Sequence, residues 1–260
     1  MYPQDILGYS PSLWVLVVTL ILCGPLQYSL LKKITAPPWR LGAYYILLIS
    51  AGIVGGKLMS LSTRDWQLYE PLIREVNSGW RYAGVLAAFI LTMPLIQRWI
   101  LPGVSLGRLA DIMALSVALG VAVFRAHCFL LGCCTGHQWE HGLAYARGSN
   151  VWWNQYNAGL IDYSAAQSLP VIPLHLLFMA ASLTTFGILL RLYRKGLPAG
   201  HLTLWFLLIH EGTKAGLELL RPFQINLFSV SAIAAIGAAI MLCYLHNSKA
   251  NWYNTPFGTD

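Results

Sequence analysis

The sequence predicts an all-α integral membrane protein with about seven transmembrane helices. Of its 260 residues, 57% are hydrophobic and only 10% are charged, and the mean hydropathy is +0.57. A soluble domain carries about a quarter charged residues, so this chain has too few to cover a surface that faces water. The apolar residues also gather into seven long stretches with shorter polar segments between them.

Each apolar stretch comes close to the roughly 20 residues that a helix needs to cross a bilayer. The stretches are 11–31, 41–61, 80–97, 109–131, 171–191, 200–220 and 226–246. The third is the weakest, because Arg81 and Gln97 lie near its ends. The first is too long for the apolar core of a signal peptide, so we expect it to be a span. No repeat or linker interrupts the chain, which predicts one polytopic domain over residues 1–260.

The loop charges predict the orientation of the chain, since cytoplasmic loops carry an excess of Lys and Arg. One side collects the basic residues Lys32, Lys33, Arg40, Arg98, Arg108, Arg191, Arg194, Lys195 and Lys249. This side is predicted to be cytoplasmic, which places the N-terminus outside, the C-terminus inside and an extracytoplasmic loop at about 132–170. The net charge of +7 comes without a basic run, so it indicates topology and anionic lipid rather than nucleic acid.

The outer loop is unusually rich in Trp, Tyr and Asn, with the sequence VWWNQYNAGLIDY at 151–163. Such a composition suits a segment that lies at the interface between lipid and water. Two interpretations stay open. The loop forms an aromatic belt, or it forms a lid over a site that faces the lipid.

Ionisable residues inside the spans are the first candidates for function, because burying a charge in a membrane is costly. They are Lys57, Arg125, His127, His210, Glu211, Lys214, Glu218 and Arg221. Glu211, Lys214 and Glu218 share one face of the sixth stretch, by helical spacing. One interpretation is a self-neutralised stripe that joins helices. The other is a polar cavity where Arg125, Arg221 and Lys57 bind an anion such as a lipid phosphate, which the planar fork of arginine suits.

The stretch RAHCFLLGCCTGHQWEH at 125–141 allows three interpretations. A metal site would draw on the cysteines and histidines, but the spacing is not of the CxxC type and adjacent cysteines are awkward ligands. A redox pair is disfavoured because adjacent cysteines bridge only through a strained ring. In the third interpretation Gly132 and Gly136 let backbone N–H groups approach a ligand, and the cysteines only fill space. We therefore predict no metal and no cofactor.

Several motifs of the chain resemble those of the prolipoprotein diacylglyceryl transferase family. The stretch ADIMALSVALGVAVFRAHCFLLGCCTG is similar to the signature of that family, with matches at Asp111, Arg125, Cys128, Gly132 and Gly136. Three further segments resemble family elements in the same order: GIVGGKLM at 52–59, GLIDYSAAQSLPVIPLH at 159–175 and KAGLELLRPF at 214–223. Together the motifs cover roughly residues 40–225.

Two positions depart from the family pattern. Ala83 stands where the family has a histidine followed by two glycines, and Ile172 replaces the histidine of a Pro-Val-His-Pro turn. The departures favour a divergent paralogue, one of those that carry two adjacent cysteines before the last glycine.

The resemblance implies a reaction and a set of site residues. The family moves a diacylglyceryl group from phosphatidylglycerol to the lipobox cysteine thiol of a prolipoprotein, which implies a multi-pass protein of the bacterial cytoplasmic (inner) membrane. For this reaction we expect Arg125 and Arg221 to clamp the leaving phosphate and Glu218 to orient one of them. The family motifs do not mark a base in this chain, and His127 is the best candidate for the thiol base. The residues expected to bind substrate are Lys57, Tyr82, Gly84, Cys128, Gly132, Gly136 and Lys214.

Alternatives from other classes stay open at this point. The partner lipid is phosphatidylglycerol or another anionic phospholipid, and the acceptor is a prolipoprotein signal peptide or another thiol or nucleophile. The same cavity would also serve a lipid-binding or transport protein without catalysis. A third hypothesis is a metal or thiol-redox membrane protein that uses the cysteines and histidines at 128–141.

Overall fold

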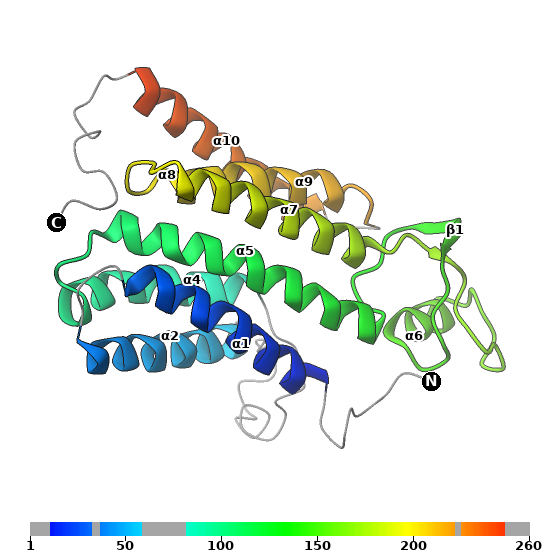
Figure 1. Cartoon of the computed structure of the whole chain (residues 1–260). Coiled ribbons are helices and arrows are strands. Elements are labelled where there is room, and N and C mark those ends of the chain that lie inside the picture. Colours follow the sequence, from blue (N-terminus) through cyan, green and yellow to red (C-terminus); the bar gives the residue numbers. More distant parts are fainter. Residues whose placement is uncertain (1–10, 33–36, 59–81, 222–224, 248–260) are drawn as a thin grey trace. The chain divides into compact units, whose positions relative to one another are not determined.

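A computed structural model describes residues 11–32, 37–58, 82–221 and 225–247, and these residues are mostly helical (Figure 1). The elements, in order, are α1 (Pro11–Leu31), α2 (Pro38–Leu58), α4 (Tyr82–Leu95), η2 (Ile96–Ile100), α5 (Leu106–Leu131), β1 (Gln138–Leu143), α6 (Asn150–Asn157), α7 (Leu174–Arg194), α8 (His201–Phe206), η3 (Leu207–Glu211), α9 (Gly212–Glu218) and α10 (Ile225–Asn247). The segments η2 and η3 are π-helical turns that continue their neighbouring helices.

Helices occupy all seven stretches that the sequence predicts as spans. Four are long and apolar enough to cross a membrane: Trp14–Leu31, Pro38–Leu58, Leu106–Leu131 and Leu174–Arg194. Two shorter apolar helices are Gly84–Ile100 and Ser231–Leu245. The sixth stretch is helical through α8, η3 and α9, but it carries the charged residues already noted. The all-α membrane class is consistent with these helices, while the count of seven spans and the orientation stay predictions.

The described chain forms two compact units, and residues 24–113 make up one of them. Here α2 packs against α4 and η2. The helices come close at Gly55, where a Cβ atom would meet the carbonyl oxygen of Gly84 and lie 2.5 Å from the Cβ of Ala88. Small residues let helix backbones approach in this way inside membranes. Gly84 therefore has a packing role in its own unit.

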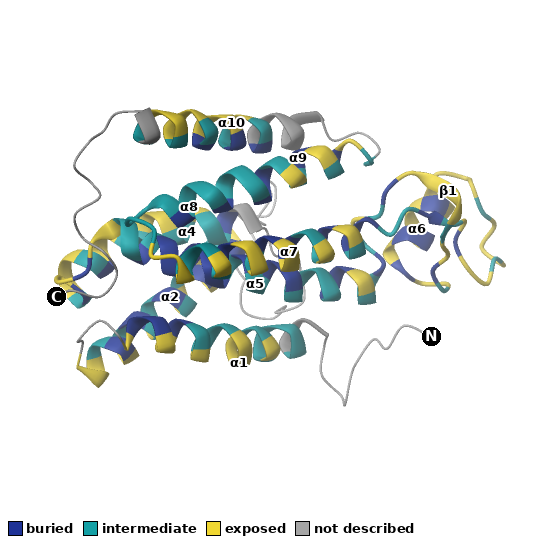
Figure 2. Cartoon of the chain, turned by 45° about the horizontal axis from the view of Figure 1, so that its top comes forward, coloured by how far each residue is buried: buried dark blue, intermediate teal, exposed yellow. Residues whose placement is uncertain are grey.

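Residues 1–23 and 114–260 form the other unit, in which α10 packs on α8, η3 and α9. Ser231, Ala235 and Ala238 of α10 are buried, and they recur at helical spacing. The opposite face exposes large apolar side chains: Ile233, Ile236, Ile240 and Tyr244. Figure 2 shows the two faces of α10 in different colours. Small residues line the helix contact, and the exposed face is suited to lipid.

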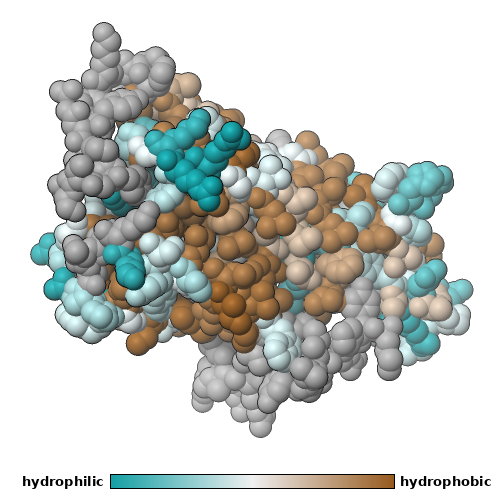
Figure 3. Space-filling model, viewed as in Figure 1, coloured by the Kyte–Doolittle hydropathy of each residue, from teal (hydrophilic) through white to brown (hydrophobic). Residues whose placement is uncertain are grey.

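The helices expose many large hydrophobic side chains. Examples are Ile46, Ile90, Leu91 and Ile21, each more than 60% exposed. Figure 3 shows hydrophobic residues over the middle of the helices, with hydrophilic residues toward their ends. A soluble monomer rarely exposes apolar surface of such extent, so these faces are suited to a bilayer.

The segment between α5 and α7 is folded, and it holds the strand β1 and the helix α6 (Figure 1). Ser149 caps α6 by accepting a hydrogen bond from the Trp152 N–H at 3.3 Å. The Trp152 side chain is fully buried, donates to the Ala165 carbonyl at 3.0 Å and stacks on Tyr156. Part of the aromatic sequence thus forms the core of this segment. Neither of the two earlier interpretations, an aromatic belt or a lid, describes this role by itself. The segment ends by leading the chain into α7.

Candidate functional site

Two arginines meet at one aromatic ring. The guanidinium carbon of Arg125, on α5, lies 4.3 Å from the ring centroid of Phe178, on α7. The guanidinium carbon of Arg221, just after α9, lies 5.6 Å from the same centroid. Phe178 is buried, so both cation–π contacts are shielded from water and stronger than at a surface. Three elements that are distant in sequence thus bring two positive charges to one place.

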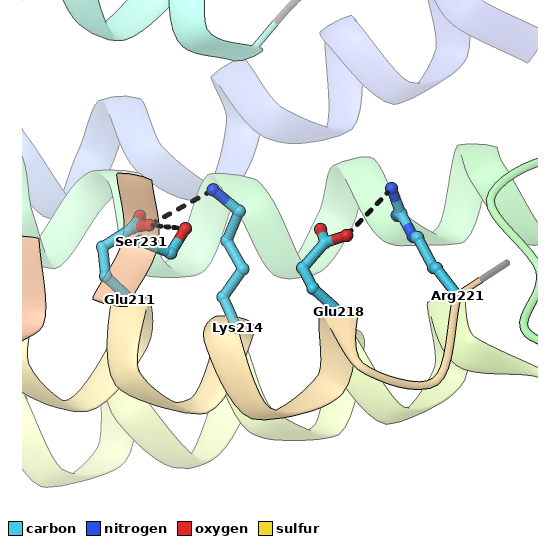
Figure 4. Close-up of polar contacts among 5 residues, drawn as sticks. All are labelled: Glu211, Lys214, Glu218, Arg221 and Ser231. Atoms are coloured by element: carbon cyan, nitrogen blue, oxygen red, sulfur yellow. Dashed lines mark hydrogen bonds and ion pairs between the residues drawn. The ribbon is translucent and has the colours of Figure 1, made fainter. Parts of the chain in front are cut away.

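Arg221 is also held by an ion pair. Its Nη1 lies 3.4 Å from Oε2 of Glu218, and the two side chains are 11% and 2% exposed. One turn earlier, Lys214 Nζ lies 3.2 Å from Oε2 of Glu211, which also accepts a hydrogen bond from Ser231 at 2.8 Å. Figure 4 shows the four charged side chains on one side of the chain. The stripe therefore consists of two ion pairs, and the charge of Lys214 is balanced by Glu211.

The glycines at the exit of α5 have packing roles in the structure. Gly132 has φ +60°, and its N–H donates to the Phe129 carbonyl at 3.2 Å. Gly136 donates to the Ile172 carbonyl at 3.0 Å, and the next N–H, of His137, donates to Leu220 at 3.0 Å. Both glycine N–H groups donate to carbonyls within the protein, and a role of these glycines in binding a ligand stays a prediction. The His137 N–H joins the exit of α5 to Leu220, the residue before Arg221.

Gly136→Ala should destabilise the site. The new Cβ would lie 2.8 Å from the Leu220 carbonyl oxygen and 2.9 Å from the Ile172 Cβ, so backbone must shift. We expect a loss of about 1–3 kcal/mol in the free energy of unfolding, the usual cost of overpacking. Thermal unfolding in detergent measures it. Gly216→Ala, where nothing lies within 4 Å, is the matched control, and an equal loss there would contradict the explanation.

A buried histidine lies at the start of α7. Nε2 of His175 is 2.8 Å from the Tyr145 hydroxyl, and both residues are buried. The ring of His175 also lies 5.3 Å from the ring of Phe129, centroid to centroid. Tyr145 in turn fills the space beside Gly132, where a Cβ would be 2.9 Å from its ring. The folded segment after α5 thus fixes His175. His127, the predicted base, is also buried, on α5 beside Phe124.

Three cysteines gather where α5 ends. The Sγ atoms of Cys128, Cys133 and Cys134 all lie within 4.8 Å of one another. The N–H of Cys133 donates to the Cys128 carbonyl at 3.1 Å, which folds the chain back, and Cys134 has φ 57°, rare for a residue with a side chain. Hydrogen bonds from the other two thiols lower the pKa of Cys134, and the positive charges of Arg221 and Arg125 lower it further. The three side chains form one cluster beside the arginines, which spacing alone did not indicate.

Comparison with known families accounts for most of the chain. The profile of the prolipoprotein diacylglyceryl transferase family matches residues 12–247. The chain belongs to this family. A comparison with curated proteins gives no significant match. As a member of a transferase family with long apolar helices, this prolipoprotein diacylglyceryl transferase relative is a multi-pass membrane protein.

The remaining predicted site residues of this family member lie in the unit of residues 24–113. Lys57 is buried in the last turn of α2. Gly84 lies in the first turn of α4, where its carbonyl approaches Gly55. Tyr82 begins α4, and its side chain lies outside the described residues. A meeting of Lys57 with Arg125 stays a prediction, because the two belong to different units.

Sequence reasoning missed two contacts in the site of this transferase relative: the ring of Phe178 and the Tyr145–His175 pair. It named the cysteines as one possible metal or redox site, but it did not show that Cys128, Cys133 and Cys134 gather together. No local pattern marks Phe178, which is one apolar residue among many in α7. Tyr145 and His175 are 30 positions apart, so only the folded segment between α5 and α7 reveals the pair. The cysteines were visible, but their side-chain directions were not.

Proposed function

We propose that this family member moves a diacylglyceryl group from phosphatidylglycerol to a cysteine thiol, classically the lipobox cysteine of a prolipoprotein. The observation that carries the proposal is the meeting of Arg125 and Arg221 at the Phe178 ring, with Glu218 paired to Arg221. Two guanidinium groups in a water-poor place are suited to a phosphate, which each binds with two parallel hydrogen bonds.

The reaction requires one bond to form and one to break. The thiol sulfur attacks the glyceryl carbon that carries the phosphate, a thioether C–S bond forms, and the C–O bond breaks with its electron pair left on oxygen. Glycerol 1-phosphate leaves. Charge grows on the phosphate as this bond breaks, so Arg125 and Arg221 stabilise the transition state more than the ground state. Glu218 holds Arg221 in the orientation that the phosphate needs.

The thiol must also lose its proton to become a nucleophile. Ala83 and Ile172 occupy the two positions where the family pattern has histidines. His127 keeps the role of base in this proposal, and His175 is the second candidate because Tyr145 fixes its ring. The proposed substrate-binding residues are Lys57, Tyr82 and Gly84 in one unit and Cys128, Gly132, Gly136 and Lys214 in the other.

The setting follows from the same proposal. We place the chain in the bacterial inner membrane as one polytopic domain of seven spans, with the N-terminus outside and the segment at 132–170 on the outer side. The distribution of basic loop residues supports this orientation. The site would then open toward the outer leaflet, where the anionic phospholipid and the signal peptide of a prolipoprotein meet it.

A reconstituted assay tests the function. The purified full-length chain in phosphatidylglycerol vesicles is mixed with a lipobox peptide or with other small thiols. We expect glycerol 1-phosphate to be released in step with a mass increase of one diacylglyceryl group on the acceptor. Vesicles of phosphatidylethanolamine, whose headgroup carries no net charge, are the matched control. Saturable binding of phosphatidylglycerol with no release for any acceptor would reject catalysis in favour of a lipid-binding protein.

A further inference from the structure

The three-cysteine cluster has the geometry of a metal site with one open position. Zinc binds cysteine sulfur at about 2.3 Å in a tetrahedron, which places neighbouring sulfurs slightly less than 4 Å apart. The three Sγ atoms, all within 4.8 Å of one another, need only small side-chain shifts to reach this spacing. Among the described residues, no fourth His, Cys, Asp or Glu side chain joins them. Three protein ligands with a fourth position open to solvent or substrate is the pattern of catalytic zinc sites.

The backbone supports a dedicated site. The hydrogen bond from Cys133 to the Cys128 carbonyl closes a turn at the end of α5, and Cys134 follows with its left-handed φ of 57°. A side chain in this conformation is strained, and such strain is found where the surrounding structure imposes a functional arrangement. Cys128 is buried, Cys133 is half-buried and Cys134 is exposed, so the cluster is anchored on one side and accessible on the other.

We propose that Cys128, Cys133 and Cys134 bind a zinc ion whose fourth position receives the thiol of the acceptor. Cysteine thiolates select soft or borderline metals such as zinc and copper(I). Zinc has no redox chemistry, so it can hold a substrate thiol without oxidising it. A zinc ion with three thiolates carries one negative charge, and a fourth thiolate adds another. Arg125 and Arg221, whose charges act on Cys134, would balance this anion.

This inference rests on the proposed function. It supplies a way to deprotonate the acceptor thiol in a chain that lacks the two histidines of the family pattern. A thiol that coordinates zinc is deprotonated outright, so its proton passes to solvent before the attack. The sulfur then forms the C–S bond to the glyceryl carbon, and the C–O electron pair leaves with glycerol 1-phosphate. The product is a neutral thioether, a weaker ligand than a thiolate, and it can leave the metal. With zinc bound, the thiol would need neither His127 as its base nor the family histidines that Ala83 and Ile172 replace.

Metal binding is tested on the purified full-length chain without any activity assay. We expect one equivalent of zinc by elemental analysis after dialysis, and less than a tenth of that in Cys128→Ser, Cys133→Ser or Cys134→Ser. The other two cysteines supply the matched controls, Cys23→Ser and Cys243→Ser, which should keep the full equivalent. Cobalt(II) in place of zinc should give thiolate-to-metal charge-transfer absorption, and added lipobox peptide should change this spectrum as its thiol becomes the fourth ligand.

The outcomes separate the metal site from the proposed function. Zinc content that is equal in the wild type and the three cluster variants would overturn the metal site. A cobalt spectrum that does not change when the lipobox peptide is added would also overturn it. Transfer at full rate in chelator-treated, zinc-free protein would overturn it and leave the proposed function standing. Stoichiometric zinc and a cobalt spectrum that changes with the peptide, but without any transfer, would support the metal site and overturn the proposed function. Cys134 is exposed, so Cys134→Ser is expected to fold even if a buried variant does not.

Discussion

Arg125→Ala should lower kcat/KM for diacylglyceryl transfer by about 10³-fold, which is the scale on which preorganised charges stabilise developing anions. The residue lies on α5, 4.3 Å from the Phe178 ring, and its buried Nε has no hydrogen-bond partner among the described residues. Its charge is therefore held in a shielded place beside Arg221, and no carboxylate among the described residues forms an ion pair with it. The rate of glycerol 1-phosphate release from phosphatidylglycerol vesicles measures the effect.

Arg147→Ala is the matched control for this change. The guanidinium carbon of Arg147 lies 4.2 Å from the ring centroid of Tyr163, so the variant also removes an arginine stacked on an aromatic ring. It belongs to the exposed part of the segment between α5 and α7, and we expect a change in rate of less than twofold. Arg125→Lys should recover part of the activity, because lysine keeps the charge but loses the two-pronged geometry. Equal losses in Arg125→Ala and Arg147→Ala would contradict a phosphate clamp at Phe178.

The helices could be predicted because membrane spans depend on the length and polarity of a local stretch. The predicted limits 11–31 match α1, and the other stretches fall on helices with ends shifted by a few residues. The π-helical turns η2 and η3 gave no such signal, since they differ from α-helix only in how the backbone hydrogen bonds are paired. Trp152 could not be assigned to a core because an aromatic residue suits both a core and a membrane interface.

Single residues of the site could be selected, but their contacts could not. Arg125, Glu218 and Arg221 were conspicuous because charges are expensive in an apolar stretch, and the family motifs gave them roles. The ring that joins the two arginines belongs to a third helix, so only tertiary structure could reveal it. Cys134 illustrates the same limit. Adjacent cysteines point apart in regular backbone, whereas Cys134 has a left-handed conformation and its sulfur lies within 4.8 Å of the other two.

Glu218 and Arg221 should act as one unit, and a double-mutant cycle tests this. Glu218→Ala leaves the Arg221 side chain, which is only 11% exposed, without its carboxylate, so we expect about 3–5 kcal/mol less stability. We also expect transfer to fall about 10²-fold, because a misplaced guanidinium no longer meets the phosphate. Arg221→Ala should lose about 10³-fold by removing the charge itself. If Glu218 acts only through Arg221, the double variant should be no slower than Arg221→Ala, and part of the lost stability should return.

The exposed pair of Glu140 and His141 supplies the control for this cycle. Oε1 of Glu140 and Nε2 of His141 lie 3.6 Å apart, but the two side chains are 85% and 74% exposed, so Glu140→Ala should change neither stability nor rate. Glu218→Gln serves if the alanine variant does not fold, since its amide oxygen can still accept a hydrogen bond from Arg221. Losses that add in the double variant would show that Glu218 works independently of Arg221. Glu218 would then have a contact of its own with substrate, and its role would change from positioning to catalysis.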